Sequence, residues 1–130
     1  MKEYKVRITE EDLQKTCTVL MADMPKESAA FLLSGIRKEN DCTELIVRRP
    51  VEIPRSEYLT QSSYHLDISP KAINGIISLC EENGLGLILC HSHSMDSSYS
   101  ESDNFGEDRL SRSLWDFLPD IPVGSLLFTP

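Results

Sequence analysis

The chain has 130 residues and a formal net charge of −8 at neutral pH, which suits one acidic domain with a moderate hydrophobic core. This charge argues against a surface that binds nucleic acid or an anionic membrane, since either would need clustered Lys and Arg, and it is compatible with a protein partner that carries a basic patch. No apolar run approaches the roughly 18 residues that cross a bilayer. We therefore expect a cytoplasmic protein.

The first half of the chain predicts one helix among strands. A short strand is expected at 4–8, followed by a helix over 9–22 that Thr9 caps. The residues expected on the buried stripe of this helix are Leu13, Cys17, Leu20 and Met21. Strands are expected at 28–37 and 44–51, and the polar, Pro-containing segment 51–63 is predicted to be a loop or an irregular excursion.

The second half repeats this alternation of strands and helices. Tyr64, Leu66 and Ile68 alternate as a strand, and Ser69 with Pro70 opens a helix that runs to about residue 83. The inward residues of that helix are predicted to be Ile73, Ile76, Ile77 and Cys80. A buried strand over 84–90 and a third helix over 103–117 follow, and an apolar strand is expected at 126–130. The pattern predicts the α/β (α+β) class, with a mixed β-sheet flanked by helices in a single domain, 1–130.

The most informative motif lies directly after the apolar run 84–90. His91 and His93 are two residues apart, so in an extended backbone their side chains lie on one side. A connection of nine residues can bring Asp103 beside them. Two imidazoles and one carboxylate form the open, three-ligand set that is typical of catalytic zinc sites. We expect one zinc ion per chain.

Glu27 is a second candidate, because it stands directly before an apolar strand of small residues, where a carboxylate without a partner or a role is unfavourable. Taken together, Glu27 before the run 29–35, His91-Ser92-His93, and Ser100 three residues before Asp103 resemble the JAMM motif of the JAB/MPN (Mov34-type) zinc metalloproteases. The similarity extends over nearly the whole chain. The small size of the chain resembles that of prokaryotic-type, deubiquitinase-like members of this family.

The resemblance implies the following roles. His91, His93 and Asp103 would be the zinc ligands, Glu27 the general base on the zinc-bound water, and Ser100 the donor that stabilises the tetrahedral oxyanion. The fold implied is the MPN fold, which is similar to that of cytidine deaminases. The partners implied are a ubiquitin-like modifier or its conjugates, together with activating-type or conjugating-type enzymes of the same system.

The sequence departs from the family pattern at three places. Ser94 stands where the family usually has Pro, the segment from Ser94 to Tyr99 is one residue shorter than usual, and Ala30 replaces a common Gly. Every ligand type nevertheless keeps its order, which indicates a divergent active member.

Several residues also have simpler interpretations. Ser100 could cap a helix, although Ser102 could cap it instead, and Asp96 could be mistaken for a ligand. His65 is most simply a solvent-side strand residue. Cys90 beside His91 could suggest a Cys–His protease, but neighbouring residues of a strand point to opposite faces. The cysteines Cys17, Cys42, Cys80 and Cys90 are expected to be small buried hydrophobic residues without disulfides.

Three functional hypotheses remain open. The first is a zinc isopeptidase or peptidase that cleaves after the C-terminal tail of a ubiquitin-like modifier, with residues 52–63 in contact with that tail. The second is a zinc peptidase acting on a sulfur-carrier protein, and the third is a non-catalytic MPN scaffold. The apolar end of the chain fits either a minimal catalytic domain or a piece of a longer protein.

Overall fold

The computed structural model describes residues 3–62, 66–92 and 123–128. The elements in these ranges are, in order, β1 (Glu3–Arg7), α1 (Glu10–Met21), β2 (Ala29–Glu39), β3 (Cys42–Glu52), the 3-10 helix η1 (Arg55–Glu57), β4 (Tyr58–Gln61), β5 (Leu66–Ile68), α2 (Pro70–Asn83), β6 (Gly86–Ser92) and β7 (Val123–Phe128). The predicted α+β class, a mixed sheet with flanking helices, is confirmed. The helix predicted at 103–117 lies outside the described residues.

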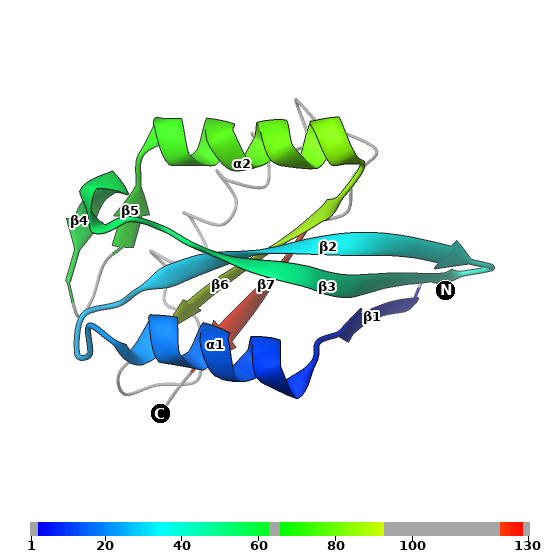
Figure 1. Cartoon of the computed structure of the whole chain (residues 1–130), viewed down its shortest axis with the longest axis horizontal. Helices are drawn as coiled ribbons and strands as arrows, with labels where there is room; N and C mark the ends of the chain where they lie inside the picture. Colours follow the sequence, from blue (N-terminus) through cyan, green and yellow to red (C-terminus); the bar gives the residue numbers. More distant parts are fainter. Residues whose placement is uncertain (1–2, 63–65, 93–122, 129–130) are drawn as a thin grey trace.

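A five-stranded mixed sheet in the order β1-β3-β2-β6-β7 forms the centre of the fold (Figure 1). β2 is antiparallel to both of its neighbours, whereas β1 runs parallel to β3 and β7 runs parallel to β6. The first seven residues of β2 and all seven of β6 are buried. Continuous apolar runs are typical of strands covered on both faces, which explains why these two lie in the middle.

Both helices begin where the sequence predicted a cap. The Thr9 hydroxyl accepts a hydrogen bond from the Asp12 amide at 3.1 Å, and the Ser69 hydroxyl accepts one from the Ala72 amide at 3.1 Å. These bonds satisfy amides that have no partner inside the first turn. α2 ends at Gly84, whose φ of 62° is the left-handed conformation that glycine adopts without strain.

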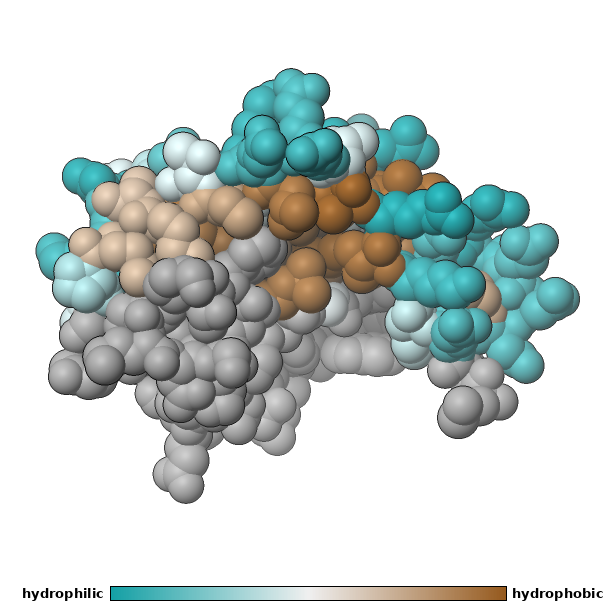
Figure 2. Space-filling view, turned by 90° about the horizontal axis from the view of Figure 1, so that it is seen from below, coloured by the Kyte–Doolittle hydropathy of each residue, from teal (hydrophilic) through white to brown (hydrophobic). Residues whose placement is uncertain are grey.

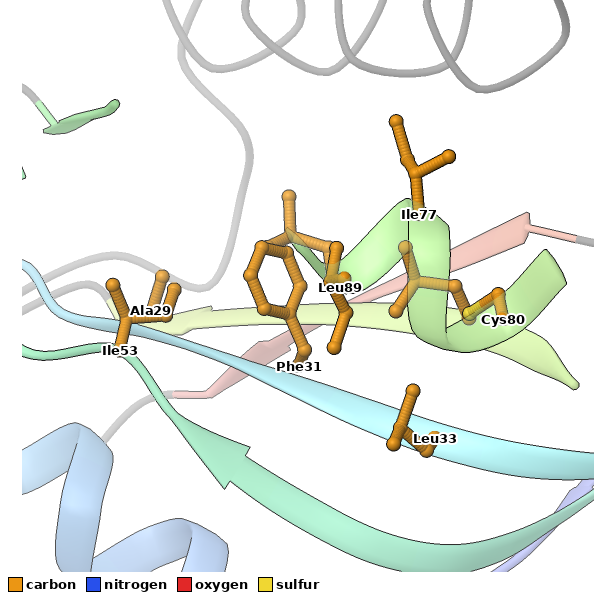
Figure 3. Close-up of a cluster of buried hydrophobic side chains, with 9 residues drawn as sticks. Ala29, Phe31, Leu33, Ile53, Ile77, Cys80 and Leu89 are labelled. Atoms are coloured by element: carbon orange, nitrogen blue, oxygen red, sulfur yellow. The ribbon is translucent and has the colours of Figure 1, made fainter. Parts of the chain in front are cut away.

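The helices cover opposite faces of the sheet (Figure 1) and create two hydrophobic cores. The core beneath α2, shown in part in Figure 3, includes Ala29, Phe31, Leu33, Leu87, Leu89, Ile76, Ile77 and Cys80. The core beneath α1 includes Leu20, Ala30, Leu32, Leu45, Val47, Ile88 and Cys90. Odd-numbered residues from 29 to 33 and from 87 to 89 therefore face α2, and the even-numbered residues between them face α1.

The prediction of a loop or irregular excursion at 51–63 is wrong for most of that segment, which contains strand and helix residues. β3 continues to Glu52, η1 follows, and β4 pairs antiparallel with β5, with Tyr58 opposite Ile68 and Gln61 opposite Leu66. The sequence Tyr-Leu-Thr-Gln of β4 does not alternate apolar and polar residues, so local periodicity gives no strand signal there. Its extended form depends on the partner strand.

The buried stripe of α1 also differs from the prediction. Leu20 and Thr16 are fully buried, Cys17 and Met21 are half-buried, and Leu13 is 38% exposed. Thr16 can occupy a buried position because its hydroxyl donates to the carbonyl of Asp12 at 2.7 Å, within its own helix.

The surface combines hydrophilic and hydrophobic areas. Figure 2 shows hydrophobic residues gathered across the middle of one face, with hydrophilic residues along its upper and right-hand sides. The exposed large hydrophobic side chains in the described ranges are Tyr4, Val6, Leu13 and Leu59. Neither of the two described helices has the length and apolar character needed to cross a membrane.

Candidate functional site

Two of the five predicted site residues, Glu27 and His91, belong to the described part of the chain. Both are 4% exposed. His93, Ser100 and Asp103 lie outside it, as do His65 and Asp96. No group of three or more His, Cys, Asp and Glu side chains gathers within residues 3–62, 66–92 and 123–128, a range that contains only one of the three predicted ligands.

The pairing of β2 with β6 brings Glu27 and His91 to the same end of the sheet. Ala29 lies directly opposite His91, and side chains at opposite positions of an antiparallel pair lie on the same face. Glu27 lies two residues before Ala29, just outside β2, and its side chain is buried at this end of the sheet. A buried imidazole on β6 and a buried carboxylate in the segment that leads into β2 thus lie at the same end of the sheet.

Ser28 and Ser92 fasten the two strands together beyond the last pair of the ladder. The Ser92 amide donates to the Ser28 carbonyl at 3.0 Å. In return the Ser28 amide donates to the side-chain oxygen of Ser92, also at 3.0 Å. Both serines are buried, and this link holds the backbone immediately beside Glu27 and His91. The sequence analysis did not identify Ser92 as a site residue, although it stands between the two predicted histidine ligands.

The segment around Glu27 is also held by β4. The Glu27 amide donates to the carbonyl of Ser62 at 2.7 Å, and the side-chain amide of Gln61 donates to the carbonyl of Glu27 at 3.0 Å. The Tyr58 hydroxyl accepts from the amide of Ala29 at 2.9 Å and donates to its carbonyl at 3.1 Å. Sequence reasoning missed Tyr58 and Gln61, because both lie in the segment that was predicted to be a loop.

Cys90 belongs to the other face of the sheet. It packs in the core beneath α1, whereas the position opposite His91, Ala29, packs beneath α2. The expectation that these neighbours point to opposite faces is confirmed. Burial raises the pKa of the Cys90 thiol to about 12, with a smaller contribution from Cys17, so the thiol stays protonated at neutral pH. Because the thiolate is the reactive form, this environment disfavours a thiol nucleophile.

The other cysteines follow the prediction only in part. Cys80, on the buried side of α2, is fully buried, but Cys17 and Cys42 are half-buried. All four cysteines are free thiols.

Comparisons with known proteins give a fold neighbour and no family. No family model matches the sequence, and no curated protein matches it. The fold is similar to the solution structure of protein DSY2949 from Desulfitobacterium hafniense, with a TM-score of 0.55 and 21% sequence identity. The match covers 78% of this chain and 65% of that chain, so the chain spans slightly less than two thirds of that protein's length. At this identity the likeness concerns the fold alone.

Proposed function

We propose that the protein is a JAMM-type zinc metalloprotease that cleaves after the C-terminal tail of a ubiquitin-like modifier. The observation that carries this proposal is the pairing of β2 with β6, which brings the buried His91 and the buried Glu27, two residues before β2, to one end of the sheet. The motif order supports it, since His93, Ser100 and Asp103 follow His91 within twelve positions of the sequence.

The donor chemistry fits zinc. His91 is the last residue but one of the buried strand β6, so its imidazole sits where water has little access. Imidazole nitrogens and carboxylate oxygens are common zinc ligands. His91, His93 and Asp103 would hold the ion. When bound, zinc acts as a Lewis acid that lowers the pKa of a water molecule towards about 7 and polarises the carbonyl under attack.

Glu27 would move the protons. A carboxylate next to the reacting water can accept its proton and pass it to the leaving amine, a role that typically contributes roughly 100- to 10,000-fold in rate. Ser100 would donate a hydrogen bond to the oxygen on which negative charge develops; loss of one such donor costs about 2.7–4 kcal/mol in other enzymes.

Residues 52–63 are the proposed contact for the modifier's tail. In the described ranges β4 pairs with β5 alone, which leaves its other edge for the backbone of an extended peptide. Leu59 of β4 is 61% exposed and offers an apolar contact beside that edge. A tail that ends in Gly could approach the metal closely, because glycine has no side chain. The released partner would be a lysine-linked target or a short C-terminal extension.

The test combines a zinc measurement with a cleavage assay. The wild-type protein is expected to bind one zinc ion per chain and to cut a modifier fused through its tail to a reporter. Glu27→Gln keeps the size of the side chain but removes the base, so zinc content should stay near normal while hydrolysis falls by at least about 100-fold. His91→Ala should lose most of the zinc.

Glu44→Gln is the matched control. Glu44 is also buried, pairs with Arg7 at 3.0 Å and lies towards the far end of the sheet, so this variant should cleave at the wild-type rate. Full hydrolysis by Glu27→Gln, or full zinc content in a His91→Ala, His93→Ala double variant, would contradict the assignment. An unrelated unfolded protein cut as fast as the fusion would show a general peptidase, and a zinc-free protein that cuts neither would fit a scaffold.

A further inference from the structure

The backbone at Ala29 needs a partner that β3 does not supply. The last pair between β2 and β3 is Ala30 with Glu52, so the ladder on that side of β2 stops one residue short of Ala29. Ala29 is fully buried, and a buried amide or carbonyl without a hydrogen bond is unfavourable. The Tyr58 hydroxyl fills this place, because it accepts from the amide at 2.9 Å and donates to the carbonyl at 3.1 Å. The Tyr58 hydroxyl thus makes the two hydrogen bonds that a neighbouring strand would otherwise make with Ala29.

The side chain of Gln61 also binds this segment, at the backbone of Glu27 itself. Its side-chain nitrogen lies 3.0 Å from the carbonyl oxygen of Glu27, 3.1 Å from a carboxylate oxygen of Asp23 and 3.3 Å from the hydroxyl of Ser28. A carbonyl and a carboxylate only accept hydrogen bonds, so these partners fix which end of the amide faces them. Arg55 donates to the same Asp23 carboxylate, which ties η1 to this cluster.

These contacts hold the segment 27–29 from two sides. β6 binds it through the bonds between Ser28 and Ser92. On the other side it is bound by Tyr58 and Gln61 of β4 and by the carbonyl of Ser62, which directly follows β4. The backbone of this segment carries the Glu27 side chain, so a shift of the backbone would also shift the carboxylate. A displacement of about 1 Å at a reacting group can cost roughly 100-fold in rate.

We propose that Tyr58 and Gln61 are positioning residues that hold Glu27 in place through the backbone of residues 27–29. This inference rests on the proposed function, in which Glu27 is the base. Because β4 is also the proposed contact for the tail, the strand that receives the substrate is the strand that orients the base.

The experiment measures kcat, KM and zinc content in Gln61→Met and Tyr58→Phe, together with amide hydrogen exchange at Glu27 and Ala29. Gln61→Met keeps the length of the side chain and removes its donors, whereas Tyr58→Phe removes only the hydroxyl. We expect kcat to fall at least about tenfold in Gln61→Met with zinc content unchanged. Exchange at Ala29 should be at least about tenfold faster in Tyr58→Phe, while the amides of Phe31 and Leu33 keep their protection.

Gln14→Met and Tyr4→Phe are the matched controls, because these side chains are exposed and distant in sequence from the segment. Both should match the wild type in rate and exchange. Wild-type kcat in Gln61→Met, with or without faster exchange, would overturn the positioning role. If the wild-type protein cleaves no tail fusion, the proposed function fails by itself. Unchanged exchange at Glu27 and Ala29 in both variants would then reject the ordering of the segment as well.

Discussion

Ser92 has a structural role that its neighbours in the sequence conceal. It stands between two histidines whose side chains can bind a metal. Its own hydroxyl accepts a hydrogen bond from the Ser28 amide and so extends the link between β2 and β6. Its partner lies 64 positions away, so nothing in the local pattern indicates the bond. A role that depends on a distant backbone group can be seen only once the register is known.

We predict that Ser92→Ala lowers the free energy of unfolding by about 1–3 kcal/mol, because it leaves the buried Ser28 amide without its acceptor. Equilibrium unfolding in urea measures this change. Ser78→Ala, on the exposed side of α2, is the control and should change stability by less than about 0.5 kcal/mol. Equal effects from the two substitutions would show that the bond contributes nothing.

At the scale of elements, the two helix caps have the same chemistry in different surroundings. Thr9 caps α1 at the surface. Ser69 is buried, and besides capping α2 its hydroxyl donates to the Glu57 carboxylate while its amide donates to the Glu57 carbonyl at 2.8 Å. The start of α2 is therefore attached to η1 as well as capped.

Ser69→Ala should consequently destabilise the protein more than Thr9→Ala. Loss of a helix cap costs about 0.5–2 kcal/mol of stability. We expect Thr9→Ala to fall near the lower end of this range. Ser69→Ala should fall at or above the upper end, because this substitution also removes the hydrogen-bond donor to the Glu57 carboxylate. Thermal and urea unfolding of both variants measure the difference. A larger loss for Thr9→Ala would show that the contact with Glu57 has no effect on stability.

The helices and central strands could be predicted because their signals are local. Thr9 and Ser69-Pro70 mark helix starts, and the apolar runs of β2 and β6 mark buried strands. The strand β4 could not be predicted, because it needs β5 as a partner. At the site, sequence chemistry singled out Glu27 and His91, whereas Tyr58 and Gln61 act through backbone groups and leave no motif. The ligand roles of His91, His93 and Asp103 and the roles of Glu27 and Ser100 stay predictions.

At the scale of the whole molecule, two cores on opposite faces of one sheet bury thiols that titrate only at high pH. Burial raises the pKa of the Cys80 thiol from 9.0 to about 11. In the unfolded chain the thiol loses its proton near pH 9, whereas in the folded protein it keeps the proton up to about pH 11. The buried Cys80 thiol therefore makes its full contribution to stability below pH 9, and this contribution is lost as the pH rises towards 11.

Cys80→Ala should flatten this loss of stability between pH 9 and 11. One thiol gives a slope of at most about 1.4 kcal/mol per pH unit, which the variant removes. Urea unfolding at pH 8, 9, 10 and 11 measures the slope. Ile77→Val is the control, because it trims the same core without removing a thiol and should lower stability equally at every pH. Identical slopes in the wild type and Cys80→Ala would contradict the prediction.

The distance in sequence between the two sides of the site has a consequence for folding. Helices α1 and α2 rest on contacts between near neighbours and can form early, but the bond between Ser28 and Ser92 closes a loop of 64 residues. Glu27 and His91 come together only when β2 pairs with β6, which is a non-local and therefore slow step. A newly made chain thus has helices before it has the candidate site, and any activity that depends on Glu27 and His91 together has to wait until the central sheet is complete.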